Sequence, residues 1–434
     1  MCPCYGFAMH LPPLHDRIAQ AARRLPADPA LQAQFTTCAL NTLETTTERL
    51  DDGSTFVFTG DIPALWLRDS SAQVRHYLLL AADVPEVQAL VAGLIRRQMD
   101  CILLDPYANA FNKGPTGGGH PGDLTDAHPM VWERKYEVDS LCYPLDLAWQ
   151  FWKRSGVTTV FDDAWRKAVR TVAALFRTEQ RHFEDSPYRF ERPHAVQTDT
   201  LRNQGRGMPV NYTGMTWSGF RPSDDACEFG YLIPANMFAV VALRHSAEIL
   251  RTVCHDVALA TELETLADEI DHGIQAYGTV LHPVHGKIYA YETDGFGNHH
   301  LMDDANVPSL LSIPYLGYAP ADDPVVQATR RFVLSRDNPY FQQGSRAQGI
   351  GSPHTPPGFV WPIGLAMQGL TSSDHQERLA LIAMLRDCDA DTGLIHESFH
   401  PDRPEEFTRP WFAWANTLFA ELLIETYGLN QRDR

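Results

Sequence analysis

The sequence predicts an all-α fold, and three observations support this prediction. Thirteen stretches of the chain place apolar residues at helical spacing. Strand-like alternation is confined to short pieces such as 54–59 and 287–291. Long loops rich in Gly, Pro, Trp and acidic residues return after pairs of helices. Helical hairpins joined by such loops favour one barrel with the loops gathered at one mouth.

The predicted helices follow one another along the whole chain. In the fourth of them, Val87, Leu90, Val91, Leu94 and Ile95 form one broad apolar stripe. The predicted helices span 13–25, 28–50, 70–82, 84–104, 136–155, 159–184, 225–250, 255–277, 305–315, 324–335, 359–370, 374–389 and 410–427. The long loops between them are predicted at 59–69, 109–132, 204–224, 344–358 and 391–409.

Composition excludes several classes of protein. The 434 residues carry 54 acidic and 36 basic side chains, a net charge of −18, which argues against a nucleic-acid or membrane-surface partner. A hydrophobic share of 44% excludes wholesale disorder. No apolar stretch is long enough to span a bilayer. Because no low-complexity linker divides the chain, we predict a single domain over 1–434, with 1–11 as an unstructured amino-terminal tail.

The amino terminus and the cysteines indicate the cellular compartment in which the protein is expected. The first residues show neither a basic region nor a continuous apolar region, so the sequence predicts no secretory signal and a cytoplasmic protein. Eight cysteines are scattered along the chain, and only Cys2 and Cys4 are close. No second Cys or His cluster completes a metal site beside that pair. The cysteines are therefore predicted to be buried free thiols in a reducing compartment.

One loop carries aromatic residues and acids directly before a predicted helix: Trp217, Arg221, Ser223, Asp224 and Asp225. One interpretation is helix capping by Ser223 or Asp224, with Asp225 in the first turn, where the helix dipole favours acids. A second interpretation is a sugar site, because aromatic rings cover the apolar face of a pyranose and carboxylates bind its hydroxyls. A carboxyl crowded by a second carboxylate also has its pKa raised, which suits a general acid.

A second loop contains the sequence H-E-S-F-H, which begins at His396 and ends at His400. It matches the H-E-x-x-H signature of zinc peptidases, with Glu421 as a candidate third ligand. That chemistry needs both imidazoles on one face of a helix. Pro401 directly follows and disfavours the helical conformation at His400, so we expect an extended loop here. The zinc peptidase is therefore the weaker alternative, and Glu397 is available for another role.

Two further loops carry residue types that suit a carbohydrate. Arg68 and Asp69 beside Trp66 fit bidentate recognition of vicinal hydroxyls, although Asp69 is equally explained as the N-cap of the helix that follows. The loop 349–362 is fixed by its Gly and Pro content, and His354 and Trp361 are candidates to line a pocket. The alternative for His354 is a structural hydrogen bond.

Six motifs together resemble glycoside hydrolase family 125, the metal-independent exo-α-1,6-mannosidases. The most specific of them, Gly-Met-Thr-Trp-Ser-Gly-Phe-Arg-Pro-Ser-Asp-Asp, spans 214–225, and the resemblance runs from about residue 30 to the carboxyl end. It implies an (α/α)6 barrel and inverting hydrolysis of a terminal α-1,6-linked mannose without a metal ion or other cofactor. The motifs lie, in order, at 60–70, 136–140, 215–230, 302–306, 349–361 and 393–399.

The resemblance also implies roles for individual residues. Asp224 corresponds to the general acid, with Asp225 as a sugar ligand or the alternative acid, and Glu397 corresponds to the general base. Arg68 and Asp69 would hold the terminal mannose. The remaining residues expected around the pocket are Trp66, Trp217, Arg221, Asp303, His354 and Trp361.

Inversion sets a geometric expectation. One carboxylic acid protonates the departing oxygen while a carboxylate activates water on the opposite face of the ring, so the two groups stand about 6.5–9.5 Å apart. We expect this spacing between Asp224 and Glu397 and a mannose-containing oligosaccharide as substrate. The alternatives are an α/α-barrel glycosidase acting on an α-glucoside, the zinc peptidase, and a non-catalytic lectin. The natural glycan and the oligomeric state stay open.

Overall fold

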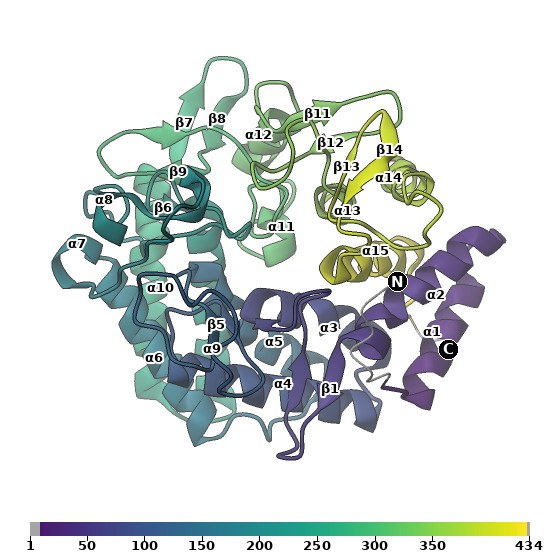
Figure 1. Cartoon of the computed structure of the whole chain (residues 1–434), viewed down its shortest axis with the longest axis horizontal. Coiled ribbons are helices and arrows are strands. Elements are labelled where there is room, and N and C mark those ends of the chain that lie inside the picture. The colour runs from purple at the N-terminus through teal and green to yellow at the C-terminus, as the bar shows by residue number, and fades with distance from the viewer. Residues whose placement is uncertain (1–8, 432–434) are drawn as a thin grey trace.

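A ring of paired helices forms the body of the protein (Figure 1). The computed structural model describes residues 9–431, so Cys2, Cys4 and most of the predicted tail lie outside the described residues. Six helices follow the inside of the ring, and six others cover them on the outside. The predicted all-α class is therefore confirmed.

The inner helices pack side by side around the axis of the ring. Helix α3 packs against α5, α5 against α9, and α9 against α11, while α13 packs against α15. The ring closes where α15, the last helix, packs against α3. The inner helices are α3 (Leu67–Ala81), α5 (Val138–Ser155), α9 (Ile233–Thr252), α11 (Ile313–Leu316), α13 (Pro362–Leu370) and α15 (Ala413–Tyr427).

Each outer helix precedes one inner helix along the chain, which gives six outer–inner pairs and an (α/α)6 barrel. An additional helix, α1 (Pro12–Arg24), packs on the first outer helix. The outer helices are α2 (Pro29–Thr45), α4 (Pro85–Leu104), α6 (Asp163–Glu179), α10 (Val257–Tyr277), α12 (Pro324–Val333) and α14 (His375–Asp387). Two four-residue helices, α7 (His182–Asp185) and α8 (Arg202–Gly205), lie in the long connection between α6 and α9.

The two sets of helices begin differently. Five outer helices start at an aspartate whose side chain accepts hydrogen bonds from the first turn: Asp28, Asp162, Asp256, Asp323 and Asp374. None of the six inner helices has a side-chain cap. The first N–H groups of the inner helices are therefore not satisfied by cap side chains, and they give each helix start a partial positive charge.

Short antiparallel strands build the loops of the barrel. Two three-stranded ribbons, β3-β4-β5 and β10-β9-β6, lead directly into α3 and α9. The other strands form four hairpins. The strands are β1 (Thr47–Arg49), β2 (Thr55–Val57), β3 (Leu65–Trp66), β4 (Ala110–Phe111), β5 (Val131–Glu133), β6 (Tyr231–Leu232), β7 (Thr279–His282), β8 (Gly286–Tyr289), β9 (Glu292–Thr293), β10 (His299–His300), β11 (Phe341–Gln343), β12 (Gln348–Ile350), β13 (Ser398–His400) and β14 (Arg403–Thr408).

The predicted helix 225–250 starts too early. Helix α9 begins at Ile233, so neither Ser223 nor Asp224 caps it, and the helix-capping interpretation is wrong. The chain before it is bent and not helical, because Glu292 accepts the N–H groups of Glu228 and Phe229, at 3.0 and 2.9 Å. Side-chain acceptors have taken the donors that a helix would use.

The predicted helix 305–315 is also wrong over most of its length, since only α11 forms. Asp303 accepts the backbone N–H groups of Leu310 and Leu311 at 2.8 and 3.0 Å. Pro308 has no N–H to donate and its ring disfavours a continuous helix. Three differences are smaller. The helix predicted at 28–50 ends at Thr45, and the helix predicted at 159–184 is divided into α6 and α7. Asp69 lies inside α3 and is not its N-cap.

The core is formed by apolar side chains from both rings of helices. Five of the six described cysteines are buried free thiols, as predicted, and Cys254 is half-buried. Among residues 9–431, no helix combines the length and the apolar character that a membrane crossing requires.

Candidate active site

One pocket lies at the end of the barrel where the inner helices begin. Arg68 and Asp69 belong to the first turn of α3, Trp361 precedes α13, and Phe412 precedes α15. The pocket therefore faces the positive ends of several helices, which favour negative charge. Its walls consist of Thr59, Ile62, Trp66, Arg68, Asp69, Pro222, Ser223, Asp224, Asn306, His354, Trp361, Glu397, Arg409, Phe412 and Trp414.

Asp224 stands on a tight turn that leads into the pocket. Its N–H donates to the carbonyl of Arg221 at 2.9 Å, and the N–H of Arg221 donates to the carbonyl of Asp225 at 2.8 Å. Asp224 has a φ of +67°, a conformation that costs about 1–3 kcal/mol for a residue with a side chain. Lys135 donates to its carbonyl oxygen at 2.8 Å and helps to hold this strained conformation.

Arg68 joins this turn to the start of α5. Its Nη1 donates to Oε2 of Glu137 at 2.6 Å and to Oδ2 of Asp139 at 3.2 Å, while Nη2 donates to Oδ1 of Asp224 at 3.1 Å. The Arg68 side chain is only 3% exposed, and those of Glu137 and Asp139 are fully buried. One buried guanidinium thus holds three carboxyl groups, one from the turn at Asp224 and two from the start of α5.

The carboxyl groups around Arg68 have different proton affinities. Burial raises the pKa of Glu137 well above its ordinary value, and the guanidinium of Arg68 opposes this only in part. Burial also raises the pKa of Asp224, but the charges of Arg68 and Lys135 and the hydrogen bond from Glu137 outweigh it, so the net shift is downward. Of these two carboxyl groups, Glu137 therefore has the higher proton affinity.

Glu397 enters the pocket from the last hairpin of the chain. It directly precedes β13 and is 7% exposed. Arg409 follows β14, and its Nη1 lies 3.4 Å from Oε1 of Glu397. The register pairs Ser398 with Thr408, which brings Glu397 and Arg409 together across the strand ends. Arg409 also forms an ion pair with Asp61, so Glu397 is held by a cation that is itself fixed.

His354 lies at the opening of the pocket. Its side chain is 38% exposed, and its Nδ1 lies 3.1 Å from Oδ1 of Asp225. Burial lowers the pKa of His354, but the hydrogen bond to Asp225 and the charges of Asp225, Asp224 and Glu397 outweigh this and raise it to about 9. His354 is therefore an imidazolium at neutral pH, and it links Asp225, which is not in the pocket wall, to the site.

Aromatic side chains supply the apolar part of the pocket wall. Trp361 is buried, and its Nε1 donates to Oγ1 of Thr355 at 2.7 Å, which fixes the indole. Trp414 lies against Arg68, with the guanidinium carbon 5.9 Å from the ring centre. Trp66 and Phe412 complete this part of the wall. A pocket that combines aromatic rings with fixed charges matches the surface of a sugar, which has apolar faces and hydroxyl groups.

The H-E-x-x-H sequence does not form a zinc site. Its second half is the strand β13, so the two histidines do not share a helix face. Both ring nitrogens of His396 face backbone carbonyls, of Pro410 at 2.6 Å and Asp389 at 3.1 Å. His400 accepts the N–H of Asp402 instead, and Glu421 is held by Arg75. The zinc-peptidase alternative is therefore wrong.

Four residues expected in the pocket do not line it: Asp225, which is linked to the site through His354, and Trp217, Arg221 and Asp303. Trp217 is buried behind the loop, where its ring stacks on His182 with centres 3.5 Å apart. Arg221 forms an ion pair with Glu292 at 2.6 Å and lines a neighbouring groove. Asp303 is fully buried and, as described above, accepts two backbone N–H groups. Trp217 and Arg221 were expected in the pocket because they share a loop with the two aspartates, and Asp303 was expected there from the family resemblance alone.

Several residues that contact the site were not predicted to do so. Glu137 and Asp139 belong to a motif used for the family resemblance, but no separate signal marked their contact with Arg68. Arg409 was missed because its partner, Glu397, is twelve positions away across a hairpin whose register is not visible in the sequence. Asn306 follows a pair of aspartates and lines the pocket.

Comparison with known proteins identifies the family of this chain. Residues 28–424 match the family of metal-independent α-mannosidases. The chain belongs to glycoside hydrolase family 125. The proteins of this family are α-mannosidases that act without a metal ion.

Three relatives illustrate the range of similarity. A metal-independent α-mannosidase of Streptococcus pneumoniae, solved as a non-productive complex with α-1,6-mannobiose, is 47% identical; the match covers 97% of this chain and 100% of that one, with a TM-score of 0.95. The meiotically up-regulated gene 157 protein of Schizosaccharomyces pombe is 41% identical over 92% of this chain and 82% of its own length. A bacterial glucoamylase complexed with acarbose is 13% identical over 91% of this chain and 55% of that one, with a TM-score of 0.59, and shows the shared barrel fold alone.

Proposed function

We propose that this family 125 protein is an exo-acting, inverting α-1,6-mannosidase in which Asp224 is the general acid and Glu397 the general base. The observation that carries the proposal is that these two acids, from loops 173 residues apart, line one pocket together with fixed cations and aromatic rings. The mannobiose complex of the 47% identical relative supports an α-1,6-linked mannoside as the substrate.

The proposed reaction begins with proton transfer to the glycosidic oxygen. Asp224 donates this proton, and Glu137, the carboxyl group of the pair with the raised pKa, supplies it to Asp224. Arg68 contacts both carboxyl groups and keeps them within reach of each other. As the carbon–oxygen bond breaks, the leaving sugar takes the proton and departs as an alcohol.

Water completes the reaction from the opposite face of the mannose ring. Glu397 accepts one proton from the water as its oxygen bonds to the anomeric carbon, so the product has the inverted configuration. Glu397 then returns that proton to solvent, and the Glu137–Asp224 pair takes one up. The spacing of about 6.5–9.5 Å between Asp224 and Glu397 stays a prediction of this mechanism.

Product analysis tests the proposal directly. With the methyl glycoside of α-1,6-mannobiose as substrate, whose leaving sugar has a blocked anomeric carbon, NMR during the first minutes should show β-mannose as the initial free sugar, because the α-linkage is inverted. Initial release of α-mannose would contradict inversion. Equal rates on α-1,6-mannobiose and on isomaltose, its α-1,6-glucose counterpart, would favour the α-glucosidase alternative and contradict the substrate assignment.

A further inference from the structure

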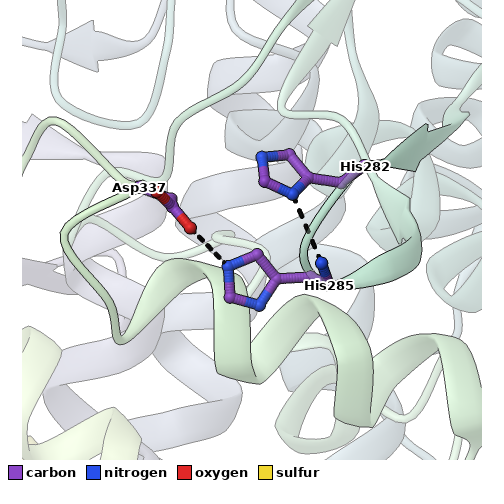
Figure 2. Close-up of side chains that lie close together, drawn as sticks. All are labelled: His282, His285 and Asp337. Carbon is purple, nitrogen blue, oxygen red and sulfur yellow. Dashed lines mark hydrogen bonds and ion pairs between the residues drawn. The ribbon is translucent and has the colours of Figure 1, made fainter.

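Three side chains of metal-ligating type meet on the β7–β8 hairpin, outside the pocket wall (Figure 2). His282 ends β7, His285 precedes β8, and Asp337 lies in the segment that follows α12. One candidate ligand atom of each residue lies within 4.8 Å of those of the other two. Two separate parts of the chain therefore contribute to one cluster.

The fold positions both imidazoles before any ligand binds. His282 pairs with Gly286 in the antiparallel register, so the turn brings His285 back beside His282 with ring centres 4.9 Å apart. Both rings pack against Phe332 of α12, at 5.5 and 5.8 Å between centres. Because the two imidazoles are already held in place, ligand binding costs little of their side-chain entropy.

The hydrogen bonds of the cluster indicate where the lone pairs point. Nδ1 of His282 accepts the backbone N–H groups of Val284 and His285 at 3.2 and 3.3 Å, so its lone pair faces the backbone of the hairpin turn (Figure 2). Nε2 of His285 lies 2.7 Å from Oδ2 of Asp337, the distance of a charge-assisted hydrogen bond. A cation that entered between these groups would replace the proton that His285 and Asp337 share and would break only the two long bonds to His282.

We propose that His282, His285 and Asp337 form a zinc site, with water as the fourth ligand. Two imidazoles and one carboxylate are a ligand set that zinc takes in proteins, whereas magnesium and calcium prefer oxygen ligands alone. Zinc–ligand bonds of about 2.0–2.2 Å place the ligand atoms about 3.3 Å apart in a tetrahedron. Asp337, whose side chain is 45% exposed, has the freedom to close the cluster to that spacing.

The bound ion fastens the hairpin to the segment after α12. Without it, that connection depends on the His285–Asp337 pair and on the packing against Phe332. None of the three ligands lines the mannosidase pocket, so the proposed zinc site is independent of the proposed hydrolytic mechanism.

Zinc titration of the metal-free, untagged full chain tests the proposal. Isothermal titration calorimetry should show one equivalent of zinc bound at neutral pH, and zinc should raise the Tm. In His285→Gln and Asp337→Asn we expect the affinity to fall by about 10–100-fold and the Tm to stop responding to zinc. Asp337→Asn removes an exposed carboxylate, so the fold should be retained.

The matched control is His245→Gln, which removes the histidine of another His–Asp pair, with Nδ1 3.0 Å from Oδ1 of Asp146. This variant should bind zinc as the wild type does. The proposal is overturned if the wild type binds no stoichiometric zinc. It is equally overturned if His285→Gln and Asp337→Asn bind zinc as tightly as the control.

Discussion

Nη2 of Arg68 lies 3.1 Å from Oδ1 of Asp224, so a buried cation directly contacts the proposed proton donor. A cation in this place disfavours the protonated form of the carboxyl group on which the proposed reaction depends. The buried Glu137, bound to the same guanidinium at 2.6 Å, resolves this conflict in our proposal because it retains the proton that Asp224 must deliver.

The first prediction concerns the two proposed catalytic acids. Asp224→Asn and Glu397→Gln each remove one proton-transfer role while conserving side-chain size, so kcat on α-1,6-mannobiose should fall by about 10²–10⁴-fold. Circular dichroism should show an unchanged fold. Glu405→Gln, at an exposed position of β14, is the control and should keep wild-type turnover. If either active-site variant kept a kcat near that of the wild type, the catalytic role proposed for that residue would be wrong.

The second prediction concerns Glu137. Glu137→Gln keeps a hydrogen-bonding group beside Arg68 but holds no transferable proton. We expect kcat to fall by about tenfold or more, equivalent to at least about 1.4 kcal/mol of transition-state stabilisation, with KM little changed. The decline of kcat at alkaline pH should also begin at a lower pH. A variant with reduced stability but a wild-type pH profile would indicate a structural role alone.

The third prediction concerns Arg409, which holds Glu397 at 3.4 Å. Arg409→Ala leaves the proposed base without its cation, so kcat should fall by about tenfold, or about 1.4 kcal/mol. Arg409→Lys keeps the charge but loses the planar guanidinium, so we expect its kcat to lie between those of Arg409→Ala and the wild type. Equal kinetics for the wild type and Arg409→Ala would show that Glu397 is oriented by other contacts.

The fourth prediction is a pH dependence that arises from His354. Its pKa is raised from 6.5 to about 9, so the charged ring is favoured in the folded protein. The ion pair with Asp225 is therefore complete below the ordinary pKa and is lost as the pH rises through about 9. kcat/KM should decline over that range, and His354→Gln should be less active at neutral pH without this decline. If kcat/KM of His354→Gln declined at alkaline pH in the same way as that of the wild type, another group would be responsible for the titration.

The fifth prediction concerns Trp217, which belongs to the core rather than to the pocket. Trp217→Ala removes a fully packed ring and should cost about 3–5 kcal/mol in the free energy of unfolding, measured by urea denaturation. Trp152→Ala, at a half-buried position of α5, should cost less. If Trp217→Ala instead lowered sugar affinity at unchanged stability, its assignment to the core would be wrong.

The sequence predicted the fold more completely than the site. Amphipathic periodicity located most of the helices because each buries one face, and the boundary errors occur where side chains capture backbone donors, as Glu292 and Asp303 do. Seven of the predicted site residues line the pocket: Trp66, Arg68, Asp69, Asp224, His354, Trp361 and Glu397. The contacts of Arg68 with Glu137 and of Arg409 with Glu397 depend on loop geometry, which periodicity does not encode. The single-domain organisation and the catalytic roles stay predictions.

The closure of the ring by α15 on α3 affects when the protein becomes active during its synthesis. Arg68 belongs to the first inner helix, whereas Glu397 and Arg409 belong to the last hairpin. A growing polypeptide on the ribosome thus contains Arg68, which we propose to bind the sugar, long before it contains Glu397, which we propose to activate water. Any product that is truncated before the last hairpin would lack hydrolytic activity, however well its earlier helices have folded.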